Sequence, residues 1–349
     1  MKRYLLLEDG SSYEGYAYGF KGETNGEIVF TTSMSGYLET ITDPSYAGEI
    51  LIFAFPEIAN YPLNMEHMES DKVQVAGLIT KDAHSMLSSE YGNQFNEFLK
   101  VNKVPAIDGI DTRSIVEKIR KAGAIKGYIR NKNEMPDEFE DTMDINLVSK
   151  VSRKKYQYYN SGNKKEILFI DVGTKNSLIK ELGKIASLHI VPYNCDFFNI
   201  KFHYDAIFIP NGPGNPDHPS MVLIKEFIKE KANEVPVTGV CLGNQLIALS
   251  MGGKTEKMKY GHRGVNHAVL INNRVYITSH NHGYAVNSES MKNTKMEITG
   301  RDINDGTVEM IRHKELPVFS VQFHPEAYPG PYDGSWFFNE IKKTIGDGI

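Results

Sequence analysis

Hydrophobic and polar positions follow two different patterns along this chain. Up to about residue 130, short apolar runs separated by polar turns predict mostly β-strands, for example at Tyr4–Leu7 and Gly26–Thr31. From residue 164 onward, short apolar strands alternate with segments of helical periodicity, which is the order of a parallel α/β sheet. We therefore expect an α/β protein made of two different domains.

The segment between these two parts is polar and poorly periodic, and a chain of 349 residues exceeds one typical domain. We predict a strand-rich α/β domain over residues 1–150 and a linker over 151–163, with the boundary near Ser161. An open, mainly parallel sheet is expected over residues 164–349.

Turn residues and apolar periodicity set the expected elements. The expected strands of the first domain are 4–7, 12–17, 26–31, 49–55 and 73–79, with helices at 93–100 and 111–122. The expected strands of the second domain are 167–171, 188–191, 206–210, 235–240, 268–271, 274–278, 307–311 and 317–323, with helices at 178–182, 221–231 and 242–250. Residues 211–216 and 279–284 are expected to form loops.

Composition and charge exclude several classes of function. A net charge of -5 gives no reason to expect a nucleic acid or an anionic membrane as partner. No apolar run approaches the roughly 18 residues of a membrane span, and the first residues contain only a three-leucine core, too short for a secretory signal. Two cysteines are too few for a disulfide framework. We expect a cytoplasmic protein.

One of these cysteines, Cys241, lies between a predicted strand and a predicted helix. Gly239 and Gly243 flank it at the spacing of a nucleophile elbow, in which small neighbours let a tight turn expose the reactive side chain. A helix N-terminus also favours the reactive thiolate. A lone cysteine in an apolar segment is more often a buried core residue, so its interpretation depends on partners elsewhere in the chain.

Candidate partners follow the last predicted strand, where the sequence reads His324-Pro325-Glu326. Residues two apart on an extended chain point the same way, so Glu326 can orient the imidazole of His324. A lone histidine-x-glutamate is more often a surface feature. In combination with Cys241, however, it predicts a nucleophile, a base and an orienting carboxylate.

Two predicted loops at strand ends are further candidates. Asn211-Gly-Pro-Gly214 is either a plain turn or a source of backbone N–H groups for an oxyanion, with the Leu242 N–H as a second donor. The other loop contains His280 and His282, but no cysteine or carboxylate joins them at ligand spacing, so we expect no metal. Gly253-Lys254-Thr255 imitates the end of a phosphate-binding loop but follows a predicted helix, so we expect no nucleotide there.

Together, residues 239–245, the loop 211–214 and residues 323–326 resemble the class I (triad-type) glutamine amidotransferases. Residues 30–37, 42–46, 109–113 and 327–331 resemble the small chain of glutamine-dependent carbamoyl-phosphate synthetase, so the resemblance covers nearly the whole chain. It implies hydrolysis of glutamine to glutamate and ammonia, with Cys241 forming a thioester, His324 moving protons and Glu326 orienting His324. Carried over by motif, the glutamine-binding residues would be Ser33, Gly212, Gly214, Leu242, Gln245, Asn281, Gly283 and Tyr284.

The resemblance also implies a partner chain, which the domain of residues 1–150 would contact, and it implies that this domain supplies part of the glutamine site. Ammonia would pass to a separate large synthetase chain, which makes carbamoyl phosphate from bicarbonate and ATP for arginine or pyrimidine synthesis. ATP and a divalent metal are expected in that chain, and no cofactor in this one. This sequence departs from the family at Asn244, where histidine is frequent, at Tyr284, where phenylalanine is common, and at Ile58–Pro62, which replaces a glycine-flanked loop.

Three alternatives remain. The chain could be the glutaminase of another amidotransferase complex, against which the strand-rich first domain argues. It could be a non-catalytic binding subunit of the same fold, against which the intact triad argues. It could also be a peptidase with the same triad, which γ-glutamyl peptide substrates would reveal.

Overall fold

The computed structural model describes residues 1–83 and 87–346, which divide into two compact units. Unit 1 comprises the described part of Met1–Ile145 together with Lys259–Gly264. Unit 2 comprises Asn146–Met258 and the chain from Val265 onward. The segment 151–163, expected to be a linker, contains strand β8 (Gln157–Tyr159), which pairs with β10 (Ser187–Pro192) of unit 2.

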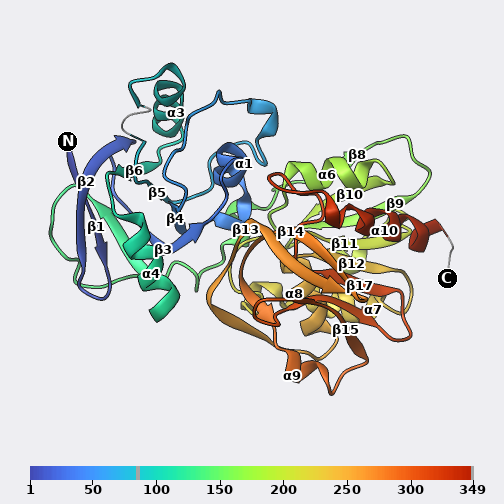
Figure 1. Cartoon of the computed structure of the whole chain (residues 1–349). Coiled ribbons are helices and arrows are strands. Elements are labelled where there is room, and N and C mark those ends of the chain that lie inside the picture. The colour runs from blue at the N-terminus through green and yellow to red at the C-terminus, as the bar shows by residue number, and fades with distance from the viewer. Residues whose placement is uncertain (84–86, 347–349) are drawn as a thin grey trace. The chain divides into compact units, whose positions relative to one another are not determined.

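Unit 1 is built on a closed barrel with the strand order β1-β2-β6-β5-β4-β3-β7 (Figure 1). The barrel closes because β1 pairs antiparallel with β2 on one side and with β7 on the other. The sequence indicated a strand-rich α/β domain but did not predict strands β6 and β7. It also did not predict the closure of the barrel, since pairing between the first and last strands leaves no local pattern. The strands are β1 (Lys2–Leu7), β2 (Ser12–Gly19), β3 (Thr24–Thr31), β4 (Glu49–Phe53), β5 (Gly77–Ile79), β6 (Pro105–Asp108) and β7 (Ile125–Arg130).

Alternate residues of the barrel strands pack into two different hydrophobic clusters. On β4, Ile50 packs in the cluster that contains Ile115 of helix α4, whereas Leu51 packs in the cluster that contains Phe95 of helix α3. Strand β4 is therefore buried on both faces. The helices are α1 (Tyr37–Thr42), α3 (Glu90–Val101) and α4 (Thr112–Ala122), with 3-10 turns at Pro44–Tyr46 and Met65–His67.

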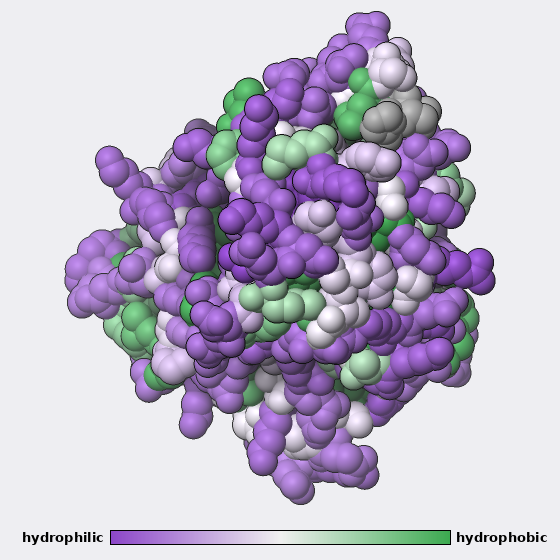
Figure 2. Space-filling view, turned by 90° about the vertical axis from the view of Figure 1, so that its left-hand side faces the viewer, coloured by the Kyte–Doolittle hydropathy of each residue, from purple (hydrophilic) through white to green (hydrophobic). Residues whose placement is uncertain are grey.

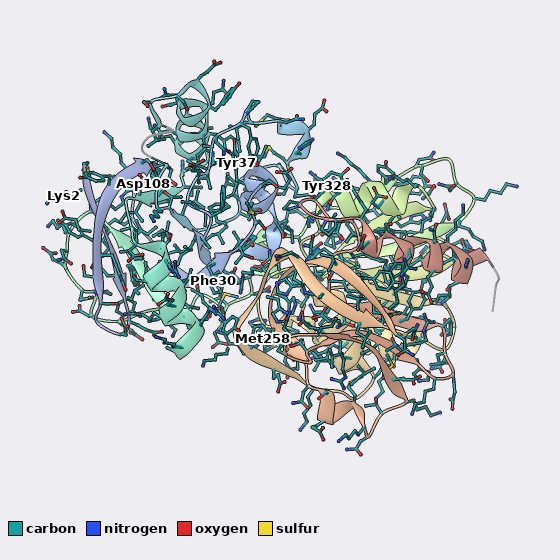
Figure 3. The ribbon with its side chains drawn as sticks, in the orientation of Figure 1. Lys2, Phe30, Tyr37, Asp108, Met258 and Tyr328 are labelled. Atoms are coloured by element: carbon teal, nitrogen blue, oxygen red, sulfur yellow. The ribbon has the colours of Figure 1, made fainter. Side chains whose placement is uncertain are left out.

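Helix α4 begins and ends where its sequence predicts. The Asp111 side chain accepts a hydrogen bond from the Ser114 N–H at 3.2 Å, which caps the helix, and Gly123 at φ 111° ends it. Asp108, at the end of β6 (Figure 3), similarly accepts hydrogen bonds from the Thr80 hydroxyl at 2.8 Å and the Ala83 N–H at 2.7 Å. Buried polar groups therefore fix the segment that follows β5 against the end of β6.

Unit 2 contains a ten-stranded sheet in the order β14-β13-β15-β16-β17-β12-β11-β9-β10-β8. The five strands from β17 to β10 are parallel, whereas β8 and the β13, β15 and β16 strands pair antiparallel. The prediction of a mainly parallel sheet is therefore right only for its central part. The strands besides β8 and β10 are β9 (Glu166–Asp171), β11 (Ala206–Ile209), β12 (Val237–Val240), β13 (Thr255–Ile271), β14 (Arg274–Val286), β15 (Met296–Asp302), β16 (Val308–His313) and β17 (Val318–Val321).

Helices cover both faces of the parallel strands. Leu168 of β9 and Ile207 of β11 pack with α7 and α8, whereas the neighbouring Ile167 and Phe208 pack with α6 and α10. Burial on both faces explains the continuous apolar runs of these strands. The helices of unit 2 are α5 (Val148–Val151), α6 (Asn176–Gly183), α7 (Val222–Lys231), α8 (Leu242–Ser250), α9 (Ser288–Met291) and α10 (Trp336–Gly346), with 3-10 turns at Phe197–Asn199, Pro219–Met221 and Asp333–Ser335.

Strand β14 corrects one prediction. Residues 279–284, expected to be a loop, continue the strand that starts at Arg274 and runs to Val286. The polar sequence Ser279–Tyr284 hid this strand, because its histidines and asparagine are buried by the neighbouring elements. The parallel strands β9, β11, β12 and β17 all end at one edge of the sheet, which brings the segments that follow them together.

Among the described residues, no helix is long and apolar enough to cross a membrane. The face of the molecule drawn in Figure 2 is mainly hydrophilic, with hydrophobic residues in small, separate groups.

Candidate active site

Cys241 lies in the turn between β12 and α8 with φ 55° and ψ -105°. A positive φ is unfavourable for a residue with a Cβ atom and costs on the order of 1–3 kcal/mol. The Cys241 N–H donates to the Val321 carbonyl at 2.9 Å, and the Gly243 N–H donates to the Pro210 carbonyl at 3.0 Å. These bonds tie the strained turn to two other strand ends, so the strand–turn–helix predicted from the sequence is present.

The two flanking glycines are needed for steric reasons. A Cβ atom at Gly239 would lie 2.9 Å from the Gly243 carbonyl carbon, and one at Gly243 would collide with the Ile209 carbonyl oxygen. Helix α8 can therefore approach β11 and β12 only if both positions lack a side chain. Cys241 is 2% exposed, and its Sγ lies 3.6 Å from the carbonyl oxygen of Asn281.

The three groups of the predicted triad lie in unit 2. His324 Nδ1 lies 2.7 Å from Glu326 Oε1. This contact was predicted from an extended chain, but β17 ends at Val321, and the Ala327 N–H donates to the His324 carbonyl in a turn. The pairing of His324 with Glu326 therefore arises from a turn and not from strand alternation.

Lys175 is a buried partner of the triad that the sequence did not reveal. Its Nζ donates to Glu326 Oε1 at 3.0 Å and to the Ala327 carbonyl at 2.6 Å. The Lys175 N–H also donates to the Asn211 side chain at 3.2 Å, and Asn211 Nδ2 donates to the Gly173 carbonyl at 3.2 Å. These bonds join the segment after β9 to the segment after β11 and to the triad carboxylate.

The charges of this group shift two pKa values in opposite directions. Burial raises the pKa of Glu326, but the positive charges of Lys175 and His324 lower it more, to about 2. Burial lowers the pKa of His324, but Glu326 and the interaction with Cys241 raise it more, to about 10. His324 is therefore a cation at neutral pH, and a cation beside a thiol stabilises the thiolate. His324 Nε2 is buried and makes no hydrogen bond of ordinary length within the described structure.

Strand β14 passes next to these groups. The His324 N–H donates to the Ser279 carbonyl at 2.8 Å, which attaches β14 to the segment after β17. Because the Asn281 carbonyl also faces the Cys241 Sγ, β14 supplies the backbone beside the thiol. Gly283 and Tyr284 follow on the same strand.

The segment after β11 provides the candidate oxyanion donors. A Cβ atom at Gly212 would collide with the Val172 carbonyl and would lie 2.9 Å from Leu242 Cδ2, so only glycine fits there. Gly214 has φ 87°, which also favours glycine. Leu242 is the first residue of α8, where backbone N–H groups lack partners within the helix.

Four buried amide and hydroxyl side chains form a network behind α8. Gln245 Nε2 donates to the Tyr284 carbonyl at 2.8 Å and to Gln322 Oε1 at 3.1 Å. Asn244 Nδ2 donates to the same Gln322 oxygen at 3.2 Å, and its Oδ1 accepts from the Ser320 hydroxyl at 2.9 Å. Asn244, which replaces the histidine frequent in the family, is thus satisfied by protein groups.

Ser33 belongs to unit 1 and follows β3. Its N–H donates to Thr31 Oγ1 at 3.2 Å, and its hydroxyl lies 3.1 Å from the same oxygen. Its assignment as a glutamine contact stays a prediction. The one sequence signal for Lys175 is its position just after the parallel strand β9, at the edge where ligands bind, but no local pattern pairs it with Glu326.

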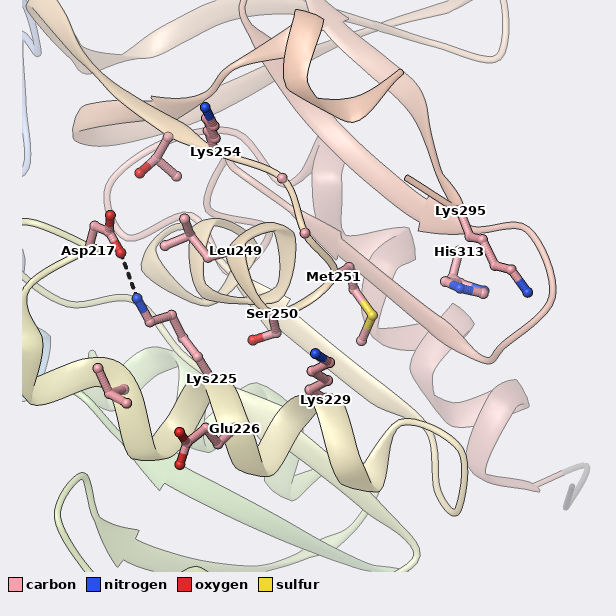
Figure 4. Close-up of a pocket in the computed structure, with 14 residues that line it drawn as sticks. Asp217, Lys225, Glu226, Lys229, Leu249, Ser250, Met251, Lys254, Lys295 and His313 are labelled. Carbon is pink, nitrogen blue, oxygen red and sulfur yellow. Dashed lines mark hydrogen bonds and ion pairs between the residues drawn. The ribbon is translucent and has the colours of Figure 1, made fainter. Parts of the chain in front are cut away.

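A pocket of about 820 Å³ lies at the other end of helix α8 (Figure 4). Cys241 precedes the first residue of α8, and the pocket is lined from Leu249 onward, about 12 Å away along a helix. The pocket is therefore separate from the triad. It includes Gly253–Thr255, which follow helix α8 as predicted, and its other charged and imidazole groups are Asp217, Lys225, Glu226, Lys229, Lys295 and His313.

Comparisons with known proteins agree with this geometry. The family described as glutamine amidotransferase class-I matches residues 168–344, which cover the parallel strands and the triad. The chain therefore belongs to the class-I glutamine amidotransferases. The carbamoyl-phosphate synthase small chain domain matches residues 5–129.

Curated relatives named carbamoyl phosphate synthase small chain match over nearly the full length. Those of Thermoplasma volcanium and Thermoplasma acidophilum are 49% and 47% identical, covering 99% of this chain and 99% of each relative. That of Caldanaerobacter subterraneus subsp. tengcongensis is 44% identical, covering 99% of this chain and 97% of the relative. The chain thus belongs to the carbamoyl-phosphate synthase small chain family and is the glutamine amidotransferase subunit of that enzyme.

Proposed function

We propose that this chain hydrolyses L-glutamine through a γ-glutamyl thioester on Cys241. The observation that carries the proposal is the burial of a cationic His324, held by Glu326, beside a thiol in a strained strand–helix turn. The thiolate attacks the side-chain amide carbon, and the His324 imidazolium gives its proton to the departing nitrogen, which leaves as ammonia. The neutral imidazole then takes a proton from water, and the hydroxide releases glutamate from the thioester.

Lys175 and Glu326 act through His324. Glu326 holds His324 Nδ1, so that Nε2 is the atom that exchanges protons. The charge of Lys175 keeps the Glu326 carboxylate ionised, as its low pKa indicates. The carboxylate in turn stabilises the imidazolium that each half of the reaction needs.

The developing negative charge on the substrate oxygen requires hydrogen-bond donors. The backbone N–H groups of Gly212 and Leu242 are the proposed donors, since both positions bring backbone close to the thiol turn. Removing one donor from an oxyanion hole lowers the rate by a factor of about 10²–10³. A side chain at position 212 that displaced this N–H should therefore slow hydrolysis strongly. The proposed glutamine contacts, besides these two, are Ser33, Gly214, Gln245, Asn281, Gly283 and Tyr284.

The ammonia would be delivered to a separate large synthetase chain. That chain would hold ATP and a divalent metal and make carbamoyl phosphate from bicarbonate, for arginine or pyrimidine synthesis. The names of the curated relatives support such a partner, since a small chain implies a large one.

The first experiment compares the two cysteines. Cys241→Ala should abolish glutamine hydrolysis, and Cys195→Ser should leave it nearly unchanged. Burial raises the pKa of Cys195 to about 11, so that residue is a neutral thiol at pH 7. Mass spectrometry of the wild-type chain quenched during turnover should find the γ-glutamyl adduct on the peptide that contains Cys241. Turnover in Cys241→Ala, or an adduct on another residue, would contradict the mechanism.

A second experiment tests Ser33. Ser33→Ala should mainly raise the KM for glutamine, by a factor of about 2–13 for the loss of about 0.5–1.5 kcal/mol from one neutral hydrogen bond. Ser12→Ala, at an exposed position of unit 1, is the control and should leave the KM unchanged. An unaltered KM in Ser33→Ala would remove Ser33 from the glutamine site.

A further inference from the structure

A second group of buried ionisable side chains lies in unit 2. His280 and His282 belong to β14, Glu309 belongs to β16, and all three side chains are at most 1% exposed. His280 Nδ1 lies 3.2 Å from His282 Nε2. The two Glu309 carboxylate oxygens lie 3.6 Å from His280 Nδ1 and 3.9 Å from His282 Nε2. Two imidazoles and one carboxylate therefore converge on one point.

The hydrogen bond of His282 fixes its proton. His282 Nδ1 lies 2.9 Å from the Tyr284 carbonyl oxygen, which can only accept a hydrogen bond. Nδ1 therefore carries the proton in the neutral ring, and Nε2 presents a lone pair toward His280.

Thr278 fixes the proton of His280 in the same way. The Thr278 hydroxyl donates to the His267 carbonyl at 3.2 Å and lies 2.8 Å from His280 Nε2. A hydroxyl has one proton, so both contacts are satisfied only when His280 Nε2 donates to the Thr278 oxygen. Neutral His280 then presents the lone pair of Nδ1 toward His282.

Two imidazole nitrogens that face each other across 3.2 Å, beside a buried carboxylate, are arranged so that they can share a cation, either a proton or a metal ion. We propose that His280, His282 and Glu309 bind one divalent transition-metal ion of the zinc type. A zinc ion about 2.05 Å from each nitrogen would subtend an angle of about 103° between them, near the tetrahedral value of about 109°. Two histidines and a glutamate are also a known zinc ligand set.

The surroundings of the three ligands fit this assignment. Metal-bound histidines usually donate their other N–H to a carbonyl, hydroxyl or carboxylate, as His282 does to Tyr284 and His280 to Thr278. The three ligand atoms lie within 4.8 Å of one another. The sequence predicted no metal at these histidines because Glu309 lies on a different strand, far along the chain.

Such an ion would have a positioning role. It would fasten β14 to β16 on both sides of Asn281, whose carbonyl oxygen faces the Cys241 Sγ at 3.6 Å. The ion would thereby fix the backbone beside the thiol without contacting the substrate. Its binding can be measured without reference to glutamine hydrolysis.

The test uses the untagged full-length chain, stripped with a chelator and then titrated with zinc alone. We expect one zinc ion per chain and, at a hundredfold excess over the dissociation constant, a rise in melting temperature of about 5 °C. Cobalt(II) in the same site should give the visible absorption of a tetrahedral complex. These measurements on the wild-type chain need no variant to fold.

Variants then locate the ion. His280→Gln and Glu309→Gln should bind zinc at least about 10-fold more weakly. His203→Gln, whose side chain is 74% exposed, is the control and should bind as the wild type does. Equal zinc binding by His280→Gln and the wild type would overturn the proposal. Absence of zinc binding by the wild-type chain would also overturn the proposal. Nitrogen NMR should then find His280 doubly protonated and paired with Glu309.

Discussion

The charge of Glu326 is balanced from two sides within a fully buried site. Lys175 Nζ and His324 Nδ1 both contact its Oε1, at 3.0 and 2.7 Å. Because the pKa of Glu326 is lowered to about 2, its ionisation contributes stability above pH 4.5 that is lost as the pH falls toward 2. Because the pKa of His324 is raised to about 10, its protonation contributes stability below pH 6.5 that is lost as the pH rises through 10.

Replacing Lys175 should therefore destabilise the chain, and more so in acid. Lys175→Met leaves Glu326 buried with one cation fewer, which should lower the free energy of unfolding by about 3–5 kcal/mol at pH 7. The pKa of Glu326 should rise, so acid unfolding should begin at a higher pH than in the wild type. Urea titrations at pH 7 and an acid titration followed by circular dichroism measure both effects.

Lys184→Met is the matched control for this variant. Lys184 pairs with Glu181 on the surface, its side chain is 66% exposed, and the loss should be about 1 kcal/mol or less. Similar losses in the two variants would mean that Lys175 contributes no more than a surface charge.

At the scale of elements, the junction of β12 and α8 depends on the absence of side chains at two glycines. Gly243 packs against the carbonyl end of β11, where its N–H donates to the Pro210 carbonyl at 3.0 Å. The close approach of helix and strand holds Cys241 at its positive φ. The shape of the nucleophile turn is thus set by packing between elements.

Gly243→Ala should open this junction. The added methyl group would collide with the Ile209 carbonyl, so we expect a loss of about 1–3 kcal/mol in the free energy of unfolding and a lower glutaminase kcat. Gly346→Ala, where no atom lies within 4 Å of the added Cβ, should change the stability by less than about 0.5 kcal/mol. Denaturant titration of both variants decides the point, and wild-type stability in Gly243→Ala would contradict the packing argument.

The sequence predicted the features that are local in the chain. Gly239 and Gly243 lie two residues from Cys241, and the turn that they predict is present. His324 and Glu326 also lie two residues apart, and the contact that their spacing predicts is present. Lys175 and Glu309 were missed because their contacts join segments far apart in sequence. Barrel closure was missed for the same reason, since β1 pairs with the last strand of its barrel.

At the scale of the whole molecule, the two family matches fall on the two units. The amidotransferase match at residues 168–344 lies in unit 2, apart from residues 259–264, and Cys241, His324, Glu326 and Lys175 all belong to that unit. The small-chain match at residues 5–129 lies in unit 1. The proposed hydrolytic chemistry is therefore confined to one unit, apart from the predicted contact of Ser33.

Ammonia production by a thiol and bicarbonate activation by ATP should consequently be separable. In the complex with the large synthetase chain, Cys241→Ser should stop carbamoyl phosphate formation from glutamine, because the thioester cannot form at a useful rate. Formation from added ammonium salt should remain near the wild-type rate, since free ammonia needs no attack by this chain. ATP-dependent product formation from each nitrogen source, measured at one pH, gives the comparison, and size-exclusion chromatography verifies that the complex is intact. Cys195→Ser is the control and should use both nitrogen sources normally. Equal loss from both sources in an intact Cys241→Ser complex would mean that this chain also takes part in the synthetic step.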